Sequence, residues 1–282
     1  MNKWYRFAAN MIVAGVIFAA LGCDRRTPTA AAPLPGPASA IPATAAAIDA
    51  ARLASADPDQ WLAPGRDSNG TYFSPLKDIN ASNVGQLGFA WAYDLGTNRG
   101  LEATPLVIDG VMYAAGNFGR VYALNAATGK EWWKYDPHID GNWARHACCD
   151  AVNRGLVAFD GRLYVGGLDG WLHALDARTG QLVWKVDTVV ARSERKPYSL
   201  TGVPLLAGDL IVVGTAGADF SGARGYISAY DRRSGELRWR FFTVPRNPAD
   251  GAQDQPHLDA ALKTWDAHHP WDSGSGLSLI HI

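Results

Sequence analysis

The sequence predicts an all-β fold built from repeated four-stranded antiparallel units, and three observations support this. A motif of Ala, Asp or Asn, Thr or Ser, Gly and Trp occurs three times. A turn that pairs Asp with Gly precedes each copy. The chain is also rich in glycine and tryptophan, with 30 Gly and 11 Trp in 282 residues. Such a composition suits tight turns between short strands that large side chains anchor.

The repeated motif predicts a strand, a turn and a second strand. Its copies lie at residues 123–133, 174–184 and 229–239. The Asp or Asn side chain bonds nearby backbone amides and the Gly tolerates positive φ, so a turn follows the first apolar run. The Trp that ends each copy is well placed to wedge between neighbouring units. Successive tryptophans stand roughly 50 residues apart, the size of one repeat in several β architectures.

A second hairpin precedes each motif. Its turns are Asp109-Gly110, Asp160-Gly161 and Gly208-Asp209, each between apolar runs. Asp-Gly between alternating apolar residues is a strong hairpin signal. Each unit thus offers about four short antiparallel strands and no amphipathic helix. We predict a β-propeller of four-stranded antiparallel blades. A β-solenoid is the alternative, although its rungs are shorter.

The N-terminus predicts export. Residues 1–23 combine a basic start with a mostly apolar run that is too short for a convincing membrane span. Ala20-Leu21-Gly22-Cys23 resembles a bacterial lipobox, although Ala20 replaces the usual Leu, Val or Ile. We expect a periplasmic protein that is acylated at Cys23 and, because Asp24 follows, anchored to the inner membrane. An ordinary cleaved signal peptide without a lipid anchor is the alternative.

The rest of the chain divides by composition. Residues 24–56 are rich in Ala, Pro and Thr and predict a tether, and residues 57–276 predict a partial propeller. The formal net charge of -1 gives no basic field for nucleic acid. Residues 277–282 match the translation of a transposon end used in sequencing libraries. We expect a non-native tail on a reading frame cut from a longer gene, with natural truncation as the alternative.

The strongest chemical signal is the adjacent pair Cys148-Cys149. The chain has 3 cysteines, and Cys23 is expected to carry lipid, which leaves this pair. In an oxidising compartment, neighbouring cysteines can close a strained and rigid vicinal disulfide ring, and two buried thiols are the alternative. A metal site is disfavoured, because adjacent cysteines lack the usual ligand spacing. The histidines show no convincing metal spacing either.

From about Trp61 to Ser275 the chain resembles the dehydrogenases that depend on pyrroloquinoline quinone (PQQ). The repeats resemble that family's tryptophan-docking motif. The family propeller has eight blades, of which about the first half is present here. The resemblance implies a disulfide between Cys148 and Cys149 that packs on one face of the quinone. It also implies that Glu102, in a Glu-Ala-Thr-Pro segment, bonds the cofactor. A solvated strand end is the alternative for Glu102.

Two further segments carry the resemblance. Arg154 matches a family arginine near the quinone's oxygens and carboxylates, and a guanidinium fork suits bidentate carboxylate binding. A surface salt bridge is the alternative. The loop that ends in Asp219 resembles the family's Gly-Ala-Glu loop. The resemblance implies that Ala216, Gly217 and Ala218 let backbone approach the cofactor and that Asp219 ligates calcium. A polar loop residue is the alternative for Asp219.

The chain departs from the family at three positions. Asp219 stands where the family has Glu, and its side chain is one methylene shorter. Ser221 is an extra residue in the same loop. Gly167 stands where the family often has a threonine that bonds the cofactor, so we expect one cofactor hydrogen bond to be missing.

The resemblance implies a PQQ- and calcium-dependent dehydrogenase that oxidises primary alcohols to aldehydes and passes electrons to a cytochrome c. A lanthanide in place of calcium stays open. Residues 198–202 and 240–245 resemble quinohaemoprotein alcohol dehydrogenases, which carry a C-terminal haem c domain. No Cys-x-x-Cys-His occurs in these 282 residues.

The resemblance also implies that only part of the catalytic machinery lies in these residues. The family's second stacking tryptophan, calcium-binding asparagine and catalytic aspartate lie downstream. We therefore assign no catalytic base within this chain and expect the chain alone to be inactive. The alternative functions are a non-catalytic propeller lipoprotein of the outer-membrane assembly type and a quinoprotein sugar or polyol dehydrogenase.

Overall fold

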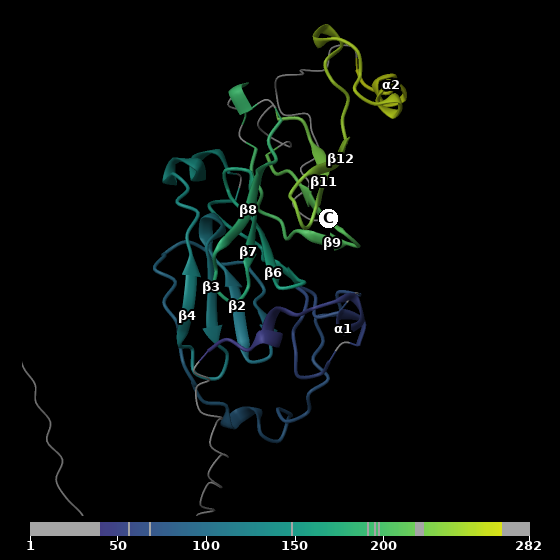
Figure 1. The fold of residues 1–282 in the computed structure, drawn as a ribbon. Helices are drawn as coiled ribbons and strands as arrows, with labels where there is room; N and C mark the ends of the chain where they lie inside the picture. Colours follow the sequence, from purple (N-terminus) through teal and green to yellow (C-terminus); the bar gives the residue numbers. More distant parts are fainter. Residues whose placement is uncertain are drawn as a thin grey trace, which may run out of the picture. The chain divides into compact units, whose positions relative to one another are not determined.

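The computed structural model contains three four-stranded antiparallel sheets, each with its strands in chain order (Figure 1). It describes residues 40–55, 57–67, 69–147, 149–190, 192–194, 196, 198–217 and 223–266. The first sheet contains β1 (Leu106–Ile108), β2 (Val111–Ala115), β3 (Val121–Asn125) and β4 (Glu131–Tyr135). The second contains β5 (Val157–Phe159), β6 (Arg162–Gly166), β7 (Trp171–Asp176) and β8 (Leu182–Asp187). The third contains β9 (Leu205–Ala207), β10 (Leu210–Gly214), β11 (Tyr226–Asp231) and β12 (Leu237–Phe242).

The helical elements are short. They are η1 (Ala43–Ala46), α1 (Ala50–Ser55), η2 (Val84–Gln86), η3 (Asn117–Gly119), η4 (Gly141–His146), η5 (Arg192–Glu194), η6 (Pro248–Asp250) and α2 (Pro256–Leu262). Within the described residues, none of these helices is long and apolar enough to cross a membrane. The predicted all-β architecture of four-stranded antiparallel units is therefore confirmed.

The predicted hairpin turns form as their sequences require. Asp109 and Gly110 both have positive φ, at 49° and 79°, and the Asp160-Gly161 turn has φ of 49° and 75°. These angles belong to the tight turns whose twist matches that of the flanking strands. In the first two sheets the first strand is therefore fixed to its neighbour by local chemistry.

The motif turns are closed by their Asx side chains. Asn125 Oδ1 accepts hydrogen bonds from the amides of Ala127 and Thr128, both at 3.0 Å. Asp176 and Asp231 do the same in the other two sheets. The register shifts by one residue at the equivalent place in all three sheets, just before this turn. The three sheets are thus repeats of one local design.

Tryptophans connect neighbouring sheets by covering the glycine of the next motif. A Cβ placed on these glycines would lie 2.5 Å from the ring of Trp91 at Gly129, 2.5 Å from Trp133 at Gly180, and 2.9 Å from Trp184 at Gly235. The predicted role of the motif tryptophans is confirmed for Trp133 and Trp184. Trp91 was not predicted. Its indole N–H donates to Ala126 O at 3.1 Å, although it lies outside any repeat of the motif.

The last part of the predicted tether is packed against the first two sheets. Ile48 is fully buried, and its carbonyl accepts a hydrogen bond from Asp160 N at 2.9 Å. Arg52, in α1, pairs with Asp109 through both terminal nitrogens, at 2.5 and 3.1 Å. Two hairpin turns thus hold residues 40–55 in place. The predicted lipid site Cys23 and the tail at residues 277–282 lie outside the described residues.

A buried histidine joins the first two sheets. His173 in β7 is 4% exposed, and its Nδ1 lies 2.8 Å from the hydroxyl of Tyr135 in β4. Burial, with a smaller contribution from the Lys185 charge, lowers the pKa of His173 from 6.5 to about 4. The ring is therefore neutral in the folded state at neutral pH, while unfolded chains bind a proton near pH 6.5.

We expect stability to fall as the pH drops from about 6.5 to 4, because only the unfolded state gains a proton at His173 in this range. The loss should reach at most roughly 3 kcal/mol. Urea unfolding at stepped pH measures it. His173→Gln removes the titrating group and should flatten this part of the profile. An equal slope in the variant would show that other groups cause the pH dependence.

Candidate functional site

The structure brings together two of the predicted cofactor contacts. Glu102 lies just before β1 and Arg154 just before β5, so each stands at the start of the first strand of its sheet. Arg154 Nη2 lies 3.1 Å from Glu102 Oε2. The Glu102 side chain is 42% exposed, whereas that of Arg154 is 14% exposed. The carboxylate is thus accessible, while the guanidinium is largely enclosed.

The backbone around Arg154 is held firmly. Asn153 is 3% exposed; its Nδ2 donates to Gly166 O and its Oδ1 accepts from Gly155 N, both at 2.9 Å. Gly155 has φ of 142°, a conformation that favours glycine. Arg154 N donates to Thr201 O at 3.0 Å. These bonds fix the backbone at Arg154 relative to β6 and to the segment before β9.

Two buried polar groups at this site lack partners among the described residues. They are Nη1 of Arg154 and Oγ1 of Thr201, and Thr201 is 2% exposed. Leaving a buried donor unpaired is costly, so such groups commonly face a ligand or water. A guanidinium N–H and a hydroxyl are both donors that suit the carboxylates of an anionic ligand. These two donors therefore fit a carboxylate-bearing cofactor such as PQQ.

Thr201 is a further site residue, and no sequence motif marks it. It stands just before β9, as Glu102 stands before β1 and Arg154 before β5. Glu102 and Thr201 stand four residues before the first strand of their sheets, whereas Arg154 stands three residues before β5. The structure thus gives each sheet one polar side chain at the start of its first strand.

The substitution at Gly167 has a structural reason. A Cβ on Gly167 would lie 2.7 Å from Asp169 Oδ1 and 3.0 Å from Ile139 Cδ1. A threonine would therefore require neighbouring groups to move. The carbonyl of Gly167 accepts a hydrogen bond from Leu200 N at 3.3 Å, and Thr201 is the next residue along that segment.

The small-residue loop lies beside the Thr201 segment. Ala216 is 2% exposed and forms an antiparallel bridge with Ser199, with Ala216 N donating to Ser199 O at 3.0 Å. Gly217 has φ of 98°. The structure therefore places Ala216 and Gly217 near Thr201. Ala218 and the proposed calcium ligand Asp219 lie outside the described residues.

The cysteine segment is described only in part. Cys149 is exposed, and Asp150 after it has φ of 65° and forms an ion pair with Arg99. Cys148 lies outside the described residues, so its pairing with Cys149 stays a prediction. Within the described part of the chain, no group of three or more His, Cys, Asp or Glu side chains could hold a metal ion.

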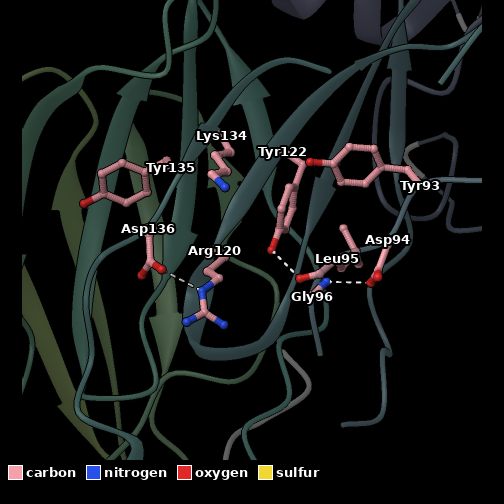
Figure 2. A pocket seen from close by; sticks show the side chains of 9 residues that line it. All are labelled: Tyr93, Asp94, Leu95, Gly96, Arg120, Tyr122, Lys134, Tyr135 and Asp136. Atoms are coloured by element: carbon pink, nitrogen blue, oxygen red, sulfur yellow. Dashed lines mark hydrogen bonds and ion pairs between the residues drawn. The ribbon is translucent and has the colours of Figure 1, made fainter. Parts of the chain in front are cut away.

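A separate cavity of about 270 Å³ lies between residues 93–96 and the strands β3 and β4 (Figure 2). Several of its polar groups are already engaged. Arg120 Nε donates to Asp136 at 2.8 Å, and the Tyr122 hydroxyl donates to Leu95 O at 3.1 Å. None of the predicted cofactor contacts lines it. The Glu102–Arg154 region, where polar groups lack partners, is therefore the stronger candidate site.

The three repeated four-stranded sheets, joined by tryptophan rings that cover glycines, form part of a β-propeller. Polar residues gather where the first strands of its sheets begin. Comparison with known proteins gives the family. Residues 61–276 match the family described as "PQQ: Glucose/ethanol/alcohol dehydrogenase, beta-propeller domain", and the chain belongs to it. The resemblance stated from the sequence is thereby confirmed.

Two curated relatives and one solved structure illustrate the similarity. The chain is 46% identical over 244 residues to the quinohemoprotein alcohol dehydrogenase ADH-IIG of Pseudomonas putida, covering 86% of this chain and 33% of that protein. It is 44% identical over 207 residues to the 1-butanol dehydrogenase (cytochrome c) of Thauera butanivorans, covering 73% and 29%. The crystal structure of quinohemoprotein alcohol dehydrogenase from Comamonas testosteroni matches with a TM-score of 0.76 and 39% identity, covering 84% and 36%. The chain thus spans about a third of the length of these relatives.

Proposed function

We propose that this chain forms part of a PQQ-dependent dehydrogenase that oxidises primary alcohols to aldehydes. The observation that carries the proposal is the Glu102–Arg154 pair, together with the partnerless Nη1 of Arg154 and Oγ1 of Thr201. A non-catalytic scaffold would gain nothing from a buried guanidinium with an unused donor, because that donor costs stability. The names of the relatives, which are alcohol dehydrogenases, support the same reading.

Each residue has a defined task in this proposal. Arg154 binds a carboxylate of PQQ through Nη1, while Glu102 holds the guanidinium through Nη2 and keeps an exposed oxygen for the cofactor. Thr201 donates a hydrogen bond from its hydroxyl. Because Ala216 and Gly217 are small residues, their backbone can lie close to the quinone ring. When bound, PQQ supplies a quinone that accepts two electrons from the alcohol, as the cofactor carries the redox chemistry.

The remaining parts of the proposal concern groups outside the described residues. Asp219 would hold Ca²⁺, or a lanthanide, whose charge polarises the quinone carbonyl. Cys148 and Cys149 would form a rigid disulfide lid over one face of PQQ. Oxidation of the alcohol releases two protons and two electrons. The electrons leave singly to a cytochrome c, or first to a haem c domain, as the names of the quinohemoprotein relatives suggest. The protein would be periplasmic and anchored to the inner membrane through lipidated Cys23.

The decisive experiment joins residues 1–276 of this chain to the remaining C-terminal part of ADH-IIG. This hybrid is called the extended protein. After reconstitution with PQQ and Ca²⁺, it should oxidise 1-butanol with a dye acceptor. Residues 1–282 alone should not, because the family's base and second stacking tryptophan come from the part supplied by ADH-IIG. Oxidation of glucose or polyols in preference to 1-butanol would support the sugar-oxidising alternative. Failure to bind PQQ would support the scaffold.

We also expect Cys148 and Cys149 to be joined in exported protein. Peptide mass spectrometry of material alkylated without reduction should find this segment unmodified and about 2 Da lighter than its dithiol form. Two alkyl groups on the segment would contradict the proposed lid. Material from a reducing cytoplasm is the control, and there both cysteines should be alkylated.

A further inference from the structure

The loop between β2 and β3 carries a buried asparagine that bridges two other segments. Asn117 is 2% exposed. Its Nδ2 donates to Gly100 O at 2.9 Å and to Ala151 O at 3.3 Å. Its Oδ1 is buried without a partner among the described residues. Because both contacted atoms are carbonyl oxygens, only this orientation of the amide satisfies them.

The loop that presents Asn117 is tightly constrained. Gly116 N donates to Arg120 O at 2.8 Å, and Phe118 N donates to Ala151 O at 3.0 Å. Phe118 has φ of 63°, an unfavourable conformation for a residue with a large side chain. Strained backbone of this kind persists where the surroundings hold it, often beside functional sites. The loop is thus a fixed support for the asparagine.

Contacts of the Phe118 ring constrain this loop further. The ring is 8% exposed and packs with buried Ala151 and Leu168. The guanidinium groups of Arg99 and Arg120 lie 5.7 and 5.6 Å from the ring centroid, within the range of cation–π attraction. Arg99 also pairs with Asp150 at the surface. Asn117 and this ion pair therefore link the same two segments.

Those two segments are the ones that carry the proposed cofactor contacts. Gly100 lies two residues before Glu102, and Ala151 lies two residues after Cys149. We infer that Asn117 is a positioning residue, which fixes the separation between the Glu102 segment and the Cys149 segment so that both can face one bound quinone. This inference rests on the proposed function. Asn117 itself acts only through the backbone of the two segments.

The test compares Asn117→Ala and Asn117→Asp with Asn125→Ala. Aspartate keeps the size of asparagine but has no donor, which separates the lost hydrogen bonds from a cavity. Asn125 is the matched control, because it is 7% exposed and holds only its own turn at the other end of β3. Hydrogen–deuterium exchange of residues 99–104 and 149–155 is measured in chain 1–282 without PQQ. PQQ affinity is measured in the extended protein by equilibrium dialysis.

Both Asn117 variants should exchange about tenfold faster in these segments and bind PQQ about tenfold more weakly, as expected for a lost buried hydrogen bond. Asn125→Ala should lower the melting temperature without either change. The inference is overturned if exchange or affinity in Asn117→Ala stays at the wild-type value. If the wild-type extended protein binds no PQQ, the proposed function fails, and the positioning of a quinone fails with it. The exchange data then still show whether Asn117 joins the segments.

Discussion

Replacing Arg154 by alanine is expected to weaken PQQ binding by the extended protein about 100-fold, because it removes charge-assisted hydrogen bonds to a carboxylate. In this structure Arg154 is the largely buried cation of the site, and its Nη1 has no partner among the described residues. Removing it also leaves Glu102 without its counter-charge beside an anionic ligand. Dye-linked turnover of 1-butanol at limiting PQQ should fall in parallel, and PQQ titration separates affinity from maximal rate.

A lysine variant shows whether PQQ binding depends on the planar guanidinium fork or on the positive charge alone. Arg154→Lys keeps the charge but loses the planar fork, so its affinity should lie between those of wild type and Arg154→Ala. Arg162→Ala is the control. Arg162 Nη1 bonds the carbonyls of Arg232 and Arg233 at 3.1 and 2.8 Å, which ties two sheets together away from the site. Wild-type PQQ affinity in Arg154→Ala would remove the main support for the proposed site.

Local sequence chemistry was sufficient to predict the repeats. An Asx residue followed by Thr or Ser and Gly encodes its turn within a few positions, and the turns at Asn125, Asp176 and Asp231 form as expected. The two Asp-Gly hairpins have the required positive φ values. Glu102 and Arg154 could be proposed because their motifs are short and contiguous. Their 3.1 Å pairing required the structure, since they come from different sheets.

Other features depend on contacts between distant segments. Trp91 covers Gly129, but it stands in a stretch with no turn motif to mark it. Thr201 is distinguished by a buried hydroxyl without a partner among the described residues, which is a property of its surroundings rather than of its sequence. Asn117 looks like an ordinary loop residue until its two carbonyl partners are seen. Residues 40–55 lack alternation, and their burial depends on the hairpin turns they meet.

The second large effect is expected at Gly180, where alanine should destabilise the chain by about 3 kcal/mol. Gly180 has φ of 72°, and a Cβ there would lie 2.5 Å from the Trp133 ring. The ring would have to move away from the sheet that it covers, which loosens the contact between the first two sheets. Urea unfolding followed by tryptophan fluorescence measures the loss. This loss is a substantial fraction of the roughly 5–15 kcal/mol that stabilises a typical domain.

Gly161→Ala separates the two causes of this loss. Gly161 has nearly the same φ, 75°, but no atom lies within 4 Å of a Cβ placed there. This variant should therefore be destabilised only by the unfavourable positive φ of an alanine, which costs about 1 kcal/mol. The remaining difference of about 2 kcal/mol is the cost of displacing Trp133. Equal losses at Gly180 and Gly161 would mean that tryptophan docking contributes nothing to joining the sheets. In that case the strands and turns of each sheet would have to hold the repeats together without it.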